Sequence, residues 1–190
     1  MQRSLEGFVE NWPIAGRFAI SRGARTEAVV VVAVIRDGGT VGRGESVPYP
    51  RYGETTEDVA AAIQAMAGDV ANGVDRTRLQ ALMPAGAARN AIDCALWDLE
   101  ARLAGRAVAD ILGQPPLHPL VSALTVSLDT PQAMGEAAAR MTGATLIKVK
   151  VDRKNPAACL EAVRAAAPDA ALIVDPNESW TIETLAQLQP

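Results

Sequence analysis

The chain has 190 residues, 49% hydrophobic and 21% charged, with a formal net charge of −4 and a pI of about 5.1. This acidic balance offers no basic surface, so neither nucleic acid nor an anionic membrane is expected as a partner. The longest apolar run, Ala28–Ile35, has eight residues, whereas a membrane-spanning helix needs about 20.

Cysteine usage and the N-terminal residues indicate a cytoplasmic protein. Cys94 and Cys159 lack the paired spacing of a zinc site and are expected to be reduced, packed thiols. The sequence up to Trp12 has no apolar segment behind its arginine. No signal peptide is therefore expected.

The first third of the chain predicts a small antiparallel sheet. Phe8–Val9 and Ala28–Ile35 have strand-like composition, and Asp37–Gly39 is a tight-turn signal before a third strand. Residues 21–25, with one glycine and two arginines, are expected to form a loop between the first two strands. Gly42–Ser46 resembles a glycine-rich phosphate loop but lacks its third glycine, so a bulge or turn is expected.

Two helices and a boundary follow. Apolar residues recur at helical spacing from Thr56 to Asn72 and from Pro84 to Ala104. Three prolines within residues 114–119 then exclude both a helix and a central strand, which places a domain boundary at His118.

Beyond this boundary, strands and helices alternate in the manner of parallel βαβ units. The expected elements are a strand at Leu124–Leu128, a helix at Pro131–Met141, a strand at Thr145–Val151, a helix at Pro156–Ala166, a strand at Ala171–Val174 and a helix from Thr181.

Lys148 and Lys150 are the sharpest chemical feature of the sequence. Side chains alternate along a strand, so both ammonium groups share one face, about 7 Å apart. Parallel sheets are covered on both faces, and this lysine face is expected to be an interior one. A neighbouring cation and desolvation lower the pKa of a lysine, which makes a base here a reasonable hypothesis. A solvated lysine face is the alternative.

Asp175 ends an apolar strand, and Pro176 prevents the strand from continuing. The carboxyl ends of parallel strands carry the active site in such folds. Asp175 is therefore a candidate metal ligand or acid–base group, with Asn177 in support; the alternative is a turn residue that opens the next helix. Lys150 and Asp175 end successive strands and are expected to be neighbours.

Several stretches resemble one known family along the whole chain. Gly42–Glu45 with Pro48–Glu54 is similar to a hairpin and loop of its capping domain, and Ala87–Leu99 to its capping-domain helix. Lys148–Lys150 matches its K-x-K motif on the second barrel strand, and Asp175–Trp180 its D-x-N segment on the third. The family is the enolase superfamily, and the chain resembles in particular the dipeptide epimerases of its muconate-lactonizing subgroup.

The resemblance implies an α+β capping domain at residues 1–118. Residues 119–190 would then form the first three βα units of a TIM-like barrel of the modified (β/α)7β type. Three strands cannot close a barrel, and the family has further metal ligands and a second lysine later in its sequence. The chain is therefore expected to be the N-terminal part of a longer enzyme, with homo-oligomerisation left open.

The resemblance also implies chemistry: Mg²⁺-dependent epimerisation of L-Ala-D/L-Glu-type dipeptides by 1,1-proton transfer through an enediolate, in murein peptide recycling. In this hypothesis Lys150 is the base, and Lys148 lowers its pKa and touches the substrate carboxylate. Asp175 is the first Mg²⁺ ligand, with Asn177 beside it as a supporting group.

Three further residues are implied as substrate contacts. Arg25, with Arg22 nearby, matches the position that holds the glutamate side chain of the small acidic dipeptide, and Thr125 lies on the first barrel strand. Two alternatives stay open. One is another superfamily member: an N-acylamino-acid racemase, an o-succinylbenzoate synthase or a cycloisomerase. The other is a catalytically inactive, truncated binding or assembly module.

Overall fold

The computed structural model describes residues 2–21 and 23–188, which form two compact units. The first unit comprises residues 1–12 and 27–118, and the second comprises residues 13–26 and 119–190. The second unit therefore includes the tip of a hairpin whose base lies in the first.

The first unit contains the predicted antiparallel sheet, with strand order β1-β2-β3. Its strands are β1 (Ser4–Ile20), β2 (Gly23–Asp37) and β3 (Thr40–Ser46). Residues 21–25 were expected to be a loop, but β2 already begins at Gly23. Strands β1 and β2 are hydrogen-bonded to each other, and this pairing satisfies the backbone N–H and C=O groups of polar and apolar residues alike. The strands therefore continue through the polar residues near position 25.

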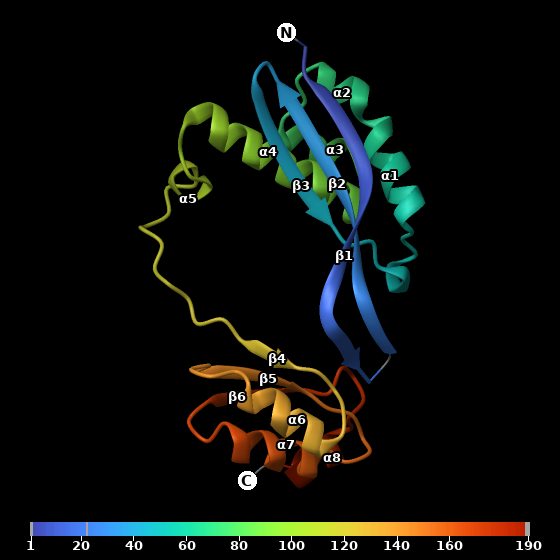
Figure 1. Ribbon diagram of the computed structural model, residues 1–190. Helices are drawn as coiled ribbons and strands as arrows, with labels where there is room; N and C mark the ends of the chain where they lie inside the picture. The colour runs from blue at the N-terminus through green and yellow to red at the C-terminus, as the bar shows by residue number, and fades with distance from the viewer. Residues whose placement is uncertain (1, 22, 189–190) are drawn as a thin grey trace. The chain divides into compact units, whose positions relative to one another are not determined.

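Helices cover one face of this sheet (Figure 1). The helices of this unit are η1 (Pro50–Tyr52), α1 (Thr56–Ala65), α2 (Ala67–Ala71), α3 (Arg76–Leu82), α4 (Ala87–Ala104) and α5 (Val108–Ile111). Helices α1 to α4 share a buried core with the sheet, whereas η1 and α5 have no buried residues. The helix expected from Thr56 to Asn72 is interrupted at Met66, and the helix expected from Pro84 begins at Ala87. Helices α3 and α5 were not predicted, because so few residues give too little periodicity to recognise.

Gly42 and Gly44 are neither a bulge nor a turn, contrary to expectation. Both lie in β3, which pairs with β2 in one continuous antiparallel register. A Cβ atom on Gly42 would lie 2.2 Å from the Ala95 carbonyl oxygen, and one on Gly44 would lie 2.0 Å from that of Ala91. The glycines therefore allow α4 to approach the strand closely, which is a packing role.

The second unit contains the predicted alternation of strands and helices, with parallel strand order β4-β5-β6. Its elements are β4 (Leu124–Val126), α6 (Pro131–Ala139), β5 (Leu146–Lys150), α7 (Pro156–Ala166), β6 (Ala171–Asp175) and α8 (Ile182–Leu188). Strand β4 is shorter than expected, and the Leu128 N–H beyond it donates to the Ala19 carbonyl of the hairpin tip.

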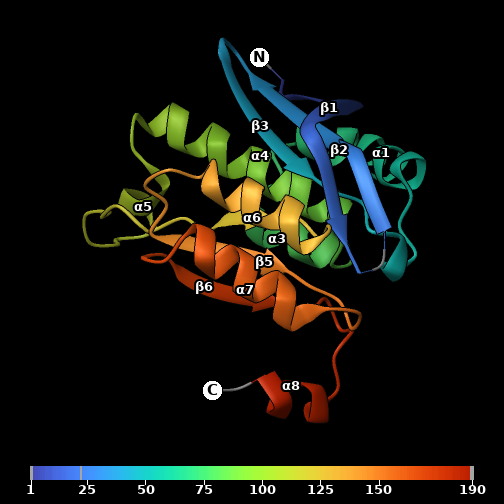
Figure 2. The same ribbon diagram turned by 60° about the horizontal axis from the view of Figure 1, so that its bottom comes forward.

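Helices α6 and α7 lie on the same face of this sheet (Figures 1 and 2). Ile147 and Val149 of β5 point to that face and are fully buried with Met134 and Val163 of the helices. Each of the two units thus has its own hydrophobic core.

Two expectations drawn from composition have mixed outcomes. No helix in the described ranges is long and apolar enough to cross a membrane. Both cysteines are free, and Cys159 is buried, but Cys94 is exposed rather than packed. Its Cβ atom nevertheless lies close to Gly44 of β3, 2.9 Å from where a Cβ atom on that glycine would be.

Candidate active site

The strand register brings four predicted site residues to one face of the parallel sheet. Thr125 of β4 pairs with Lys148 of β5, and Lys150 pairs with Asp175 of β6. Paired positions on neighbouring strands point to the same face, which here is opposite to α6 and α7. The predictions that the lysines share a face and that Lys150 neighbours Asp175 are confirmed.

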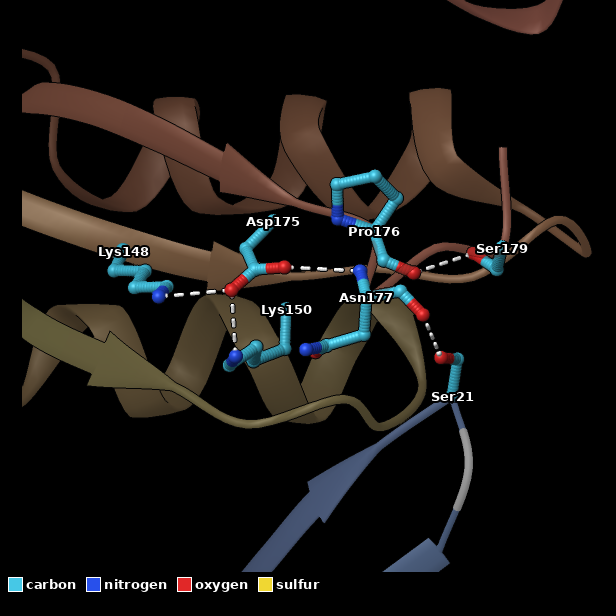
Figure 3. A network of polar contacts seen from close by, with 7 residues as sticks. All are labelled: Ser21, Lys148, Lys150, Asp175, Pro176, Asn177 and Ser179. Carbon is cyan, nitrogen blue, oxygen red and sulfur yellow. Dashed lines mark hydrogen bonds and ion pairs between the residues drawn. The ribbon is translucent and has the colours of Figure 1, made fainter. Parts of the chain in front are cut away.

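Asp175 forms ion pairs with both lysines through a single oxygen (Figure 3). Its Oδ2 atom lies 2.8 Å from Lys148 Nζ and 2.7 Å from Lys150 Nζ. The Lys150 side chain is 8% exposed and that of Lys148 is 36% exposed, so only Lys150 is interior. Hydrogen bonds from Lys148 and then Lys150 hold the pKa of Asp175 well below its ordinary value.

The chain turns sharply after β6. The Asn177 N–H donates to Asp175 Oδ1 at 2.9 Å, and the Ser179 N–H and hydroxyl both donate to the Pro176 carbonyl. Asn177 and Glu178 have positive φ angles of 47° and 65°. Such a conformation is costly outside glycine and is found where surrounding contacts enforce it.

This turn bears on the alternative interpretation of Asp175. The alternative made Asp175 a turn residue that opens the next helix. In the structure, α8 begins only at Ile182, and the Thr181 hydroxyl accepts from the Thr184 N–H at its start. Asp175 therefore does not open the next helix. It pairs with the two lysines and accepts the Asn177 N–H of the turn, and its role as a site residue stays a prediction.

Two residues of the hairpin tip that were not predicted, Phe18 and Ser21, contact the candidate site. The Phe18 ring centre lies 5.8 Å from Lys150 Nζ, and the Ser21 hydroxyl donates to the Asn177 carbonyl at 3.2 Å. Nothing local in the sequence predicts these contacts, because Ser21 and Asn177 are 156 positions apart.

The predicted substrate contacts have different placements. Thr125 is half-buried beside Lys148. Arg25 is exposed at the start of β2, and the described contacts of Lys148, Lys150 and Asp175 do not include it. Arg22 lies outside the described residues, so its predicted role stays a prediction.

The oxygen atoms of this face are compatible with a hard cation. The described residues contain no group of three or more His, Cys, Asp or Glu side chains that could hold a metal ion. Asp175 supplies one carboxylate, and the buried Asn177 Oδ1 has no hydrogen-bond partner among the described residues. Mg²⁺ prefers oxygen ligands and is often held by only one or two carboxylates, with water and substrate completing its shell.

These features define a class of protein: a capping sheet with a helical layer, followed by the start of a parallel βα barrel with lysines and a carboxylate at its strand ends. The sequence model of the mandelate racemase / muconate lactonizing enzyme N-terminal domain matches residues 3–113. The chain belongs to this family, within the enolase superfamily.

Two curated relatives are racemases or epimerases. The chain is 45% identical over 186 residues to the L-Ala-D/L-Glu epimerase of Escherichia coli K12, covering 97% of this chain and 58% of that protein. It is 41% identical over 160 residues to an N-acetyl-D-glutamate racemase of Pseudoalteromonas, covering 83% of this chain and 50% of that protein. The chain thus spans about half the length of these relatives.

Two solved structures share the fold closely. An enolase family member of Agrobacterium tumefaciens with homology to dipeptide epimerases, bound to sodium and L-Ala-L-Glu, matches at a TM-score of 0.91 and 50% identity. It covers 97% of this chain and 57% of that one. A dipeptide epimerase of Cytophaga hutchinsonii, complexed with Mg and D-Ala-L-Val, matches at a TM-score of 0.85 and 26% sequence identity. The match covers 98% of this chain and 55% of that one.

Proposed function

We propose that the full gene product is a Mg²⁺-dependent epimerase of L-Ala-D/L-Glu-type dipeptides, acting in murein peptide recycling. The observation that carries this proposal is the pair of lysines held by Asp175 at the ends of β5 and β6. Two comparisons support the substrate class: the relative named L-Ala-D/L-Glu epimerase and the structure bound to L-Ala-L-Glu.

Each residue of the face has a distinct role in this proposal. A divalent cation beside the substrate carboxylate supplies positive charge that acidifies the α-proton, and Asp175 and Asn177 are the residues that would hold it. Lys150 is the more buried lysine, and it is the base that removes the α-proton. Lys148 is more exposed, and its ammonium group binds the substrate carboxylate.

Inversion of a stereocentre requires a proton donor on the opposite face of the α-carbon. Lys148 and Lys150 lie on the same strand and the same sheet face, so neither fits this second role. In the family resemblance, this donor is a lysine later in the sequence than Pro190. Thr125 and Arg25 complete the proposal as contacts of the substrate backbone and of its acidic side chain, respectively.

A substrate panel tests the proposal. The full gene product is incubated with Mg²⁺ and, separately, L-Ala-L-Glu, N-acetylglutamate and muconate, and NMR follows each product. We expect epimerisation of the dipeptide, with at least 100-fold lower activity in Lys150→Met. Racemisation of N-acetylglutamate alone would instead favour the N-acylamino-acid racemase alternative. The 41% identical relative named N-acetyl-D-glutamate racemase supports this alternative. Turnover of muconate alone would favour a cycloisomerase.

A further inference from the structure

The tip of the β1–β2 hairpin contacts the carboxyl ends of all three parallel strands. The Ala19 carbonyl accepts from the Leu128 N–H, which follows β4, at 3.1 Å. The Phe18 ring lies against Lys150, the last residue of β5. The Ser21 hydroxyl reaches Asn177, which follows β6. The hairpin tip, residues 13–26, therefore contacts the chain beside the candidate catalytic and metal-binding residues.

Among these contacts, the Ser21 hydroxyl donates to the backbone of the turn after β6. This turn carries the candidate metal ligands Asp175 and Asn177. Asn177 has a left-handed φ of 47°, and its N–H donates to the Asp175 carboxylate. Its carbonyl accepts from Ser21, and its side-chain Oδ1 is buried without a described partner (Figure 3). A hydrogen bond to this carbonyl fixes the peptide plane that follows Asn177 and thereby opposes relaxation of the strained turn.

We propose that Ser21 is a positioning residue that couples docking of the hairpin tip to the placement of the Asp175 and Asn177 oxygen atoms. The metal-binding part of this inference rests on the proposed function. The described hydrogen bond of Ser21 is to the turn backbone, so Ser21 would act on a bound cation through the turn. Hairpin docking then strengthens cation binding, and by thermodynamic reciprocity cation binding strengthens hairpin docking by the same factor.

The size of the coupling follows from the single hydrogen bond involved. One such bond changes an equilibrium by about five-fold. Ser21→Ala is therefore expected to weaken Mg²⁺ binding about five-fold. It is also expected to speed amide hydrogen exchange of residues 177–180 by a similar factor in the absence of any metal. Ser21→Thr keeps the hydroxyl and should restore both quantities.

The experiment measures amide hydrogen exchange by mass spectrometry and Mg²⁺ affinity by calorimetry on the full gene product. The control is Ser122→Ala, which makes the same substitution at an exposed serine of the same unit. In the wild-type protein and the control, Mg²⁺ should slow exchange of residues 18–21. In Ser21→Ala, this protection should be lost.

The exchange measurement without metal separates this inference from the proposed function. Faster exchange at residues 177–180 in Ser21→Ala, reversed in Ser21→Thr, supports the positioning role even if the protein turns over no dipeptide. Unchanged exchange in Ser21→Ala overturns it, even if the protein is an active epimerase. An equal effect in Ser21→Ala and Ser122→Ala overturns it as well.

Discussion

Asp175→Asn tests how much the shared carboxylate contributes to stability. The two lysine Nζ atoms lie at most 5.5 Å apart, the sum of their 2.8 and 2.7 Å contacts with one oxygen. At about 5 Å and an effective dielectric of about 20, two like charges repel by about 3 kcal/mol. Lys148 is 36% exposed and can turn toward water, which relieves part of this repulsion. We expect the free energy of unfolding to fall by about 1–3 kcal/mol at pH 7.

Urea unfolding followed by tryptophan fluorescence, without divalent cations, measures this loss. Asp169→Asn, at an exposed carboxylate of the same unit, is the control and should change little. Adding Lys148→Met to Asp175→Asn removes one of the repelling charges and should restore part of the loss. Equal stability of Asp175→Asn and the wild-type protein at pH 7 would refute the reasoning.

The same carboxylate predicts a pH dependence with a definite sign. The pKa of Asp175 is lowered in the folded state, so its stabilising effect is complete above the unfolded-state pKa of about 4. It is lost as the pH falls below that value toward the folded-state pKa. The stability difference between the wild-type protein and Asp175→Asn should therefore be constant above about pH 5 and shrink below about pH 4. A difference that grows on acidification would contradict this assignment.

Three further predictions concern other parts of the chain. Gly44→Ala places a Cβ atom 2.0 Å from a carbonyl oxygen of α4 and should lower the free energy of unfolding in urea by at least about 2 kcal/mol. The control Gly39→Ala adds a Cβ atom in open space and should lower it far less. Glu54→Ala removes a carboxylate that accepts from the first turn of α4 at 2.6 Å and should lower the free energy of unfolding by about 1–2 kcal/mol. The control Glu57→Ala, at an exposed glutamate, should change the free energy of unfolding little. Arg25→Ala should raise KM for L-Ala-L-Glu at least 10-fold and leave that for L-Ala-L-Ala nearly unchanged in steady-state assays.

The arrangement of the candidate catalytic face could be predicted from the sequence because its determinants are local. Alternation along β5 places Lys148 and Lys150 together, and the order of parallel strands places Asp175 beside Lys150. Both rules depend on spacing within about 30 residues. The closely packed glycines of β3 illustrate the opposite case. Gly42 and Gly44 were assigned to a bulge or turn because nothing beside them in sequence reveals the helix that lies against them.

The hairpin tip could not be predicted for a related reason. Its contacts with Leu128, Lys150 and Asn177 join segments more than 100 positions apart. No periodicity within residues 13–26 encodes them. Within residues 13–26, β1 and β2 are strands because they pair with each other. They lack the hydrophobic alternation by which a strand is predicted from sequence.

The most direct test of the central claim, that Lys150 removes an α-proton, is deuterium incorporation. The full gene product, with Mg²⁺ and L-Ala-L-Glu in deuterated water, is followed by ¹H NMR at the α-position of the glutamate residue. We predict that the wild-type protein exchanges this proton for deuterium in L-Ala-L-Glu and, in a parallel reaction, in L-Ala-D-Glu. Lys150→Met should lose exchange of the epimer whose α-proton faces Lys150, while Lys154→Met, at an exposed lysine, should exchange both normally. Undiminished exchange in Lys150→Met, or none in the wild-type protein, would contradict the account.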